Sequence, residues 1–130
     1  VDVALTGDAR GAIRTLRGLK SEAVQPPVLL WALAREVRLL ANLKRDIAGG
    51  ASVNTALNQR GVWRSRQALL QSALKRLSGR DLAKMQALTF QADGSSKGFL
   101  TGAPWDLMET LVVVMAQGSG VSASKTERLK

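Results

Sequence analysis

The longest uninterrupted helical pattern in the sequence lies between two breaks, Pro26-Pro27 and Gly49-Gly50. Proline suits the first turn of a helix, because its missing amide hydrogen would be unpaired there anyway, and glycine supplies a stop. The residues between the breaks are mostly strong helix formers. Apolar side chains recur on one face at helical spacing, which predicts that this face is buried. They are Leu29, Leu33, Val37, Leu40 and Ile47. We therefore expect a long helix over residues 26–48, with the rest of the chain packed around it.

Shorter helical patterns precede and follow the long one. Asp8 and Ser52 stand where N-caps are needed, and Ser78 with Asp81 three residues later resembles a capping box. Pro104 suits the first turn of the last pattern. We expect helices over residues 9–22, 53–59 and 79–91, one that follows Arg66 and ends at Leu77, one over residues 104–117, and the end of another over residues 1–5.

These patterns predict an all-α protein, a compact bundle of about five to seven helices, because no strand-like alternation persists anywhere. Residues 93–98 are rich in glycine and serine and predict a loop, under which Phe99 and Leu100 fold back as a plug. We expect residues 1–117 to form one domain and residues 118–130 to be a disordered tail.

The charge of the chain is strongly positive and unevenly placed. The formal net charge is +9, and residues 51–80 carry six basic residues and no acidic one. Such a segment would attract phosphate backbones or an acidic protein surface. An ordinary basic protein surface is the alternative, and charge alone does not separate the two.

Several functional classes are excluded by composition. Cysteine and histidine are absent, so the usual zinc sites and the usual nucleophile and base pairs cannot form. The sequence contains no phosphate-binding loop or dinucleotide fingerprint, and its acidic residues are too scattered for a catalytic pair. We expect no enzymatic activity, no metal and no cofactor.

The lack of cysteine fits a reducing compartment, and no leader or membrane-spanning run is visible, so we expect a cytoplasmic protein. The sequence starts at Val1 in the middle of a helical pattern, which indicates a piece of a larger chain.

The segment RGVWRSR, residues 60–66, is the first candidate binding site. A helix N-terminus, guanidinium groups and a flat indole ring together suit contacts with phosphates and a stacked base. The candidate nucleic-acid-binding residues are Arg60, Trp63, Arg64 and Arg66. The alternative is that Trp63 packs into the core as a staple and the arginines are only solvated.

A second candidate surface follows the long helix. Trp31, Arg35, Arg38 and Arg45 share a face, and tryptophan and arginine are enriched in protein interfaces. The alternative is that Trp31 covers a neighbouring helix while the arginines pair with Glu36, with Asp46 or with nothing.

The last helix is apolar around much of its girth, so it is either central in the bundle or in contact with another chain. Its candidate interface residues are Leu107, Leu111 and Val114.

Three segments in this order resemble the C-terminal domain of the delta subunit of bacterial DNA polymerase III, a clamp-loader protein. They are LLWALAREVRLLANLKRDIAGG, RGVWRSRQALLQSALKRLSGRDL and PWDLMETLVVVMA, and the resemblance extends from about Leu5 to Gln117. It is a pattern of helices and not a catalytic motif, so it is moderately specific.

This resemblance implies an all-helical collar domain that packs beside those of delta-prime and the ATP-binding subunits to hold the loader together. It implies that the sliding clamp is opened by other parts of the subunit, which this sequence lacks. The tryptophan and arginine surface and the last helix would then contact neighbouring collar domains, and the segment around Trp63 would touch primed DNA. The alternative is an autonomous, basic, helical nucleic-acid-binding domain.

Overall fold

The computed structural model describes residues 1–98 and 102–118, and this part of the chain contains seven α-helices and no β-strand. The predicted all-α bundle is therefore confirmed. The helices are α1 (Asp2–Leu5), α2 (Ala9–Ser21), α3 (Pro26–Ala48), α4 (Val53–Gln59), α5 (Arg64–Arg76), α6 (Gly79–Ser96) and α7 (Pro104–Gln117). None of the described helices is both long and apolar enough to cross a membrane.

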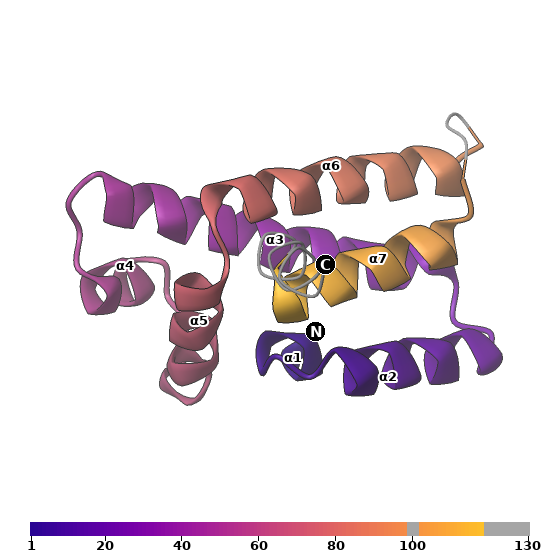
Figure 1. The fold of residues 1–130 in the computed structure, drawn as a ribbon, viewed down its shortest axis with the longest axis horizontal. Helices are drawn as coiled ribbons and strands as arrows, with labels where there is room; N and C mark the ends of the chain where they lie inside the picture. Colours follow the sequence, from indigo (N-terminus) through magenta and orange to yellow (C-terminus); the bar gives the residue numbers. More distant parts are fainter. Residues whose placement is uncertain (99–101, 119–130) are drawn as a thin grey trace, which may run out of the picture.

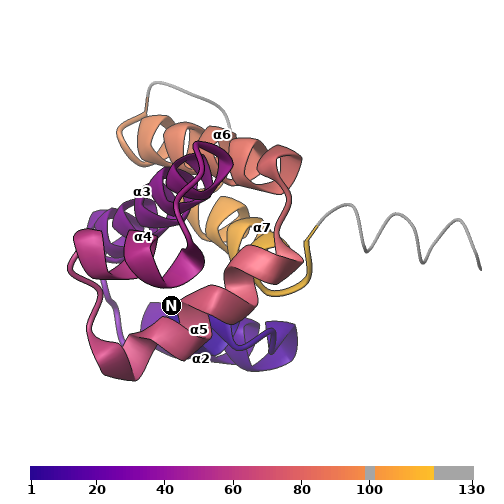
Figure 2. The same ribbon diagram turned by 90° about the vertical axis from the view of Figure 1, so that its left-hand side faces the viewer.

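The helices form two groups along the length of α3. In the larger group α7 lies between α6 and α2, and α6 also packs along α3 (Figure 1). The smaller group is α4 and α5, which lie at the C-terminal end of α3, with α5 running steeply across the others (Figures 1 and 2). Through α5, this second group also contacts α1 and α7.

The helix starts are set by local chemistry, as the sequence predicted. Asp8 accepts a hydrogen bond from the amide of Gly11, and Ser52 accepts one from Thr55. Ser78 and Asp81 form a complete capping box, in which each side chain accepts from the other residue's amide. Two orphan donors at the start of α6 are satisfied in this way.

The buried face of α3 agrees only partly with its prediction. Leu33, Val37 and Leu40 are fully buried, but Leu29 and Ile47 are only partly covered. Leu30 and Leu43, which lie outside the predicted stripe, are also buried. The physical reason is that α3 packs against α4, α5, α6 and α7, so a wider face is covered than a single stripe.

The apolar girth of α7 is buried inside the chain itself. Leu111 is 0% exposed and Val114 is 5% exposed. The prediction that these two residues contact a neighbouring subunit is therefore wrong, because the chain's own helices already surround them. Leu107 is half-buried and packs against the core.

The C-terminal half of α6 corrects a second prediction. The expected loop at residues 93–98 is helical as far as Ser96. Ala92 is fully buried, Lys97 pairs with Asp93 at 3.0 Å, and the Ser95 hydroxyl donates to the Gly102 carbonyl. Packing and these contacts outweigh the poor helix propensity of glycine and serine. The proposed plug, Phe99 and Leu100, lies outside the described residues.

Gly118 belongs to the fold, although the sequence predicts that it is the first residue of the tail. It is buried and caps α7 with φ 76°, a backbone conformation that favours glycine. A Cβ atom there would lie 3.0 Å from Asp81 Oδ2. The remaining tail, residues 119–130, lies outside the described residues.

Arg76, near the end of α5, ties three helices together. Its Nη2 donates to the carbonyls of Leu5, at 3.0 Å, and Met115, at 3.1 Å. Burial lowers the pKa of Arg76 from its ordinary value. These bonds join α5 to α1 and α7, so the guanidinium acts as an internal tie.

Replacing Arg76 by Met keeps a long side chain but removes both hydrogen bonds. We expect the free energy of unfolding to fall by about 1–2 kcal/mol, because two partly buried carbonyls lose their donor. Urea denaturation measures the change, with the exposed neighbour Lys75→Met as control. Equal stability of the two variants would contradict the role of Arg76.

Candidate interaction surfaces

Trp63 is a surface residue and not a core staple. Its side chain is 77% exposed immediately before the first residue of α5, and Arg64 beside it is exposed too. The packing alternative for Trp63 is therefore wrong. The ring and one adjacent guanidinium are available to a ligand.

Arg66 is occupied by carboxylates of the same chain. Its Nη2 lies 2.5 Å from Glu36 Oε1 and 3.0 Å from Asp2 Oδ1, so it joins α5 to α3 and α1. Glu36 is 7% exposed and sits on the inner face of α3. Burial lowers the pKa of Arg66, but the hydrogen bond and charge of Glu36, with those of Asp2, outweigh it and raise the pKa. Arg66 therefore neutralises a buried carboxylate.

Arg60 is also paired. Its Nε and Nη2 donate to the two oxygens of Asp46, at 2.9 and 3.0 Å, in a bidentate arrangement. This hydrogen bonding from Arg60 lowers the pKa of Asp46. Of the three arginines in residues 60–66, Arg64 has no ion pair with a carboxylate of residues 1–98 or 102–118.

The surface of α3 keeps its predicted composition. Trp31 is 63% exposed, and the Arg35 guanidinium carbon lies 4.9 Å from the centre of its ring, a cation–π contact. Arg38 and Arg45 are exposed on later turns of the same face. Glu36 forms its ion pair with Arg66 and Asp46 forms its ion pair with Arg60. The hydrogen bond from Arg60 is the main cause that lowers the pKa of Asp46, and the charge of Arg45 also contributes.

A groove between α3 and α6 adjoins this surface. Its volume is about 620 Å³, and Trp31, Arg38 and Phe90 are among the residues that line it. Phe90 is 74% exposed on α6, and Val28, one turn before Trp31, is 67% exposed. We call Val28, Trp31 and Phe90, with Arg35 and Arg38, the α3–α6 surface. Grouped, exposed apolar side chains of this kind mark sites of protein interaction.

Phe90 was not predicted from the sequence, because it falls outside the core spacing of α6 and has no basic residue beside it. An exposed phenylalanine on an otherwise polar helix face is the signal that could have found it. Within residues 1–98 and 102–118, no group of three or more acidic side chains is placed to hold a metal ion.

Comparison with known proteins gives consistent matches. The family model described as "Processivity clamp loader gamma complex DNA pol III C-term" matches residues 1–120. DNA polymerase III subunit delta of Escherichia coli is 30% identical over 115 residues, which are 88% of this chain and 33% of that protein. The subunit of the same name from Haemophilus influenzae is 33% identical over 86 residues, 60% of this chain and 25% of that protein. The chain thus spans between a quarter and a third of the length of these relatives.

Replacing Arg66 by Ala would leave the Glu36 carboxylate buried without its cation. We expect a loss of about 1–3 kcal/mol in the free energy of unfolding. Arg64→Ala, two residues away but exposed, is the matched control and should change stability by less than about 0.5 kcal/mol. Adding Glu36→Leu to Arg66→Ala should recover part of the loss, because no buried charge then remains. Equal effects of the two alanine variants in urea denaturation would contradict this assignment.

Proposed function

Because the chain belongs to the family of C-terminal domains of the DNA polymerase III processivity clamp loader, we propose that it is the oligomerisation domain, or collar domain, of a delta subunit. It holds the loader together while the sliding clamp is placed on primed DNA. Its partners are the ATPase subunits and delta-prime, and the sliding clamp is engaged by other parts of the subunit. The complex works in the bacterial cytoplasm, and this domain contributes binding and no catalysis.

The observation that carries this proposal is the α3–α6 surface. Val28, Trp31 and Phe90 are each more than 60% exposed, and Trp31 and Phe90 line the same groove. Covering them with another protein removes apolar surface from water. Arg35 and Arg38 beside them supply hydrogen-bond donors for a polar rim, as protein interfaces require.

A contact with primed DNA is a second part of the proposal, and it rests on Trp63 and Arg64. The exposed ring can stack on a base, and Arg64 can pair with a phosphate. Arg60 and Arg66 are held by carboxylates, so they supply little free positive charge here. This pairing favours a weak contact within a larger assembly over an autonomous nucleic-acid-binding domain, which would need several free cations.

The assembly role predicts that Trp31→Ser with Phe90→Ser leaves the chain folded but weakens its association with the ATPase subunits and delta-prime. Loss of two central aromatic contacts should raise the dissociation constant at least about tenfold. Size-exclusion chromatography and calorimetry measure it. The charge-reversed pair Arg35→Glu and Arg38→Glu should act in the same direction.

Trp63→Ala is the control for the aromatic variants, and Arg10→Glu with Arg14→Glu, exposed on α2, controls for charge. Both controls should assemble normally. Normal assembly of the Trp31 and Phe90 variant would show that the α3–α6 surface is not the subunit contact.

The DNA contact predicts weaker binding of primer–template DNA by loader complexes that carry Trp63→Ala or Arg64→Glu. Loss of one stacked base should cost about 1–3 kcal/mol, and loss of one phosphate contact should reduce the salt slope by about one. Lys84→Glu, exposed on α6, is the charge control. An unchanged affinity together with an unchanged salt slope would remove Trp63 and Arg64 from the proposed contact.

A further inference from the structure

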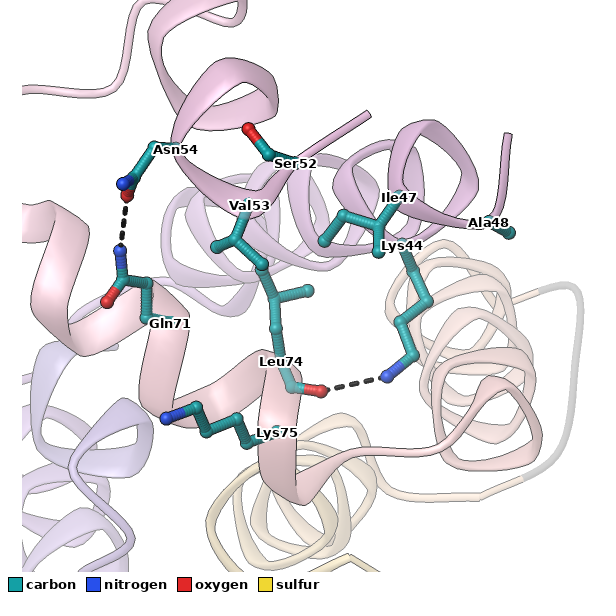
Figure 3. Close-up of a pocket in the computed structure, with 9 residues that line it drawn as sticks. All are labelled: Lys44, Ile47, Ala48, Ser52, Val53, Asn54, Gln71, Leu74 and Lys75. Carbon is teal, nitrogen blue, oxygen red and sulfur yellow. Dashed lines mark hydrogen bonds between the residues drawn. The ribbon is translucent and has the colours of Figure 1, made fainter. Parts of the chain in front are cut away.

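A second groove lies at the C-terminal end of α3, where α4 and α5 meet that helix (Figure 3). Its volume is about 530 Å³, within the range of about 300–1,000 Å³ found for ligand-binding sites. Side chains from all three helices line it, and its apolar lining comes chiefly from Ile47, Val53 and Leu74. The groove is therefore large enough to admit several apolar side chains.

The way α4 and α5 are joined leaves this groove open. Gln71 Nε2 donates to Asn54 Oδ1 at 2.9 Å, and Gln67 Nε2 donates to Asn58 Oδ1 at 3.0 Å. These amide pairs link the two helices along one edge. Val53, at the start of α4, remains only partly buried. The amide pairs between α4 and α5 thus hold the apolar lining of the groove in place.

The charged groups that line the groove are all positive. They are Lys44 and Lys75, of which Lys75 is exposed and Lys44 donates from Nζ to the Leu74 carbonyl at 2.8 Å (Figure 3). No aspartate or glutamate occurs between residues 47 and 80, so α4 and α5 contribute no carboxylate. Asp46, at the end of α3, is held by Arg60. The lysines therefore give the groove a positive potential that nothing in its lining offsets.

We infer that this groove binds a short acidic amphipathic peptide segment of a partner protein, with apolar side chains in the groove and carboxylates beside Lys44 and Lys75. Charge complementarity selects the carboxylates, and the apolar lining selects a peptide over a phosphate backbone. The lining contains no aromatic ring on which a base could stack.

This site is separate from the α3–α6 surface. Trp31 and Ile47 are sixteen residues apart on α3, which corresponds to about 24 Å along the helix axis. The two grooves also have no lining residue in common. The groove thus adds a binding function that does not depend on the proposed subunit contact.

The test uses fluorescence anisotropy with the whole chain and a labelled peptide made of leucine, phenylalanine and glutamate. Three competitor probes have defined chemistry: a peptide with lysine in place of glutamate, a peptide with serine in place of the apolar residues, and a single-stranded oligonucleotide. Lys75→Glu reverses the free charge of the groove, and Ala48→Trp fills it from an exposed position. Lys84→Glu and Ala83→Trp, exposed on α6, are the matched controls.

The expected result is binding of the acidic apolar peptide that falls about tenfold with Lys75→Glu and with Ala48→Trp, while the α6 controls bind like the unchanged chain. Backbone amide shifts should change in residues 44–54 and 71–75. The proposal is overturned if the groove variants bind the peptide normally, or if the serine or lysine peptide binds equally well. Tighter binding of the oligonucleotide with the same sensitivity to Lys75→Glu would assign the groove to nucleic acid. If peptide binding is lost once the chain joins the other loader subunits, the groove is a subunit contact and the proposal is overturned.

Discussion

The burial of α7 is the constraint on which the rest of the structure depends. This helix carries apolar side chains around most of its circumference, and Met108, Leu111 and Met115 are completely removed from water. One neighbouring helix cannot cover such a surface, so α6 and α2 flank it and α1, α3 and α5 complete its surroundings. The arrangement of the other helices follows from this burial, because α7 comes last in the sequence and must still be enclosed by the helices that precede it.

Two half-buried arginines fix how these elements meet. Arg66 joins α1, α3 and α5 through carboxylates, and Arg76 joins α5 to α1 and α7 through backbone carbonyls. Both arginines lie in residues 51–80, the segment with six basic residues and no acidic one, so part of the positive charge of this segment stabilises the fold and is not available to a ligand. The count of six cations in residues 51–80 therefore overstates the number that are free to bind a ligand.

The long helix α3 separates two surfaces of different chemistry. Near its N-terminal end, exposed aromatic side chains and arginines form the α3–α6 surface, which suits a neighbouring collar domain. At its C-terminal end, lysines rim an apolar groove that suits an acidic peptide. We propose that these two surfaces bind different partners, which α3 would hold apart.

Local sequence patterns were enough to predict most of the helices and the family. Prolines, serine caps and glycine stops act within a few residues, so α3, α4 and the capping box of α6 were predictable from local chemistry. Tertiary structure decided which polar residues are free. The sequence suggests that Arg60 and Arg66 bind a ligand, yet both form ion pairs with carboxylates from α3 and α1. The sequence suggests that Leu111 and Val114 lie in an interface, yet both lie in the core. Phe90 became a candidate only when the packing of α6 on α3 placed it in the same groove as Trp31. These outcomes depend on contacts between residues far apart in the chain, and helical periodicity carries no information about which distant side chain will meet which.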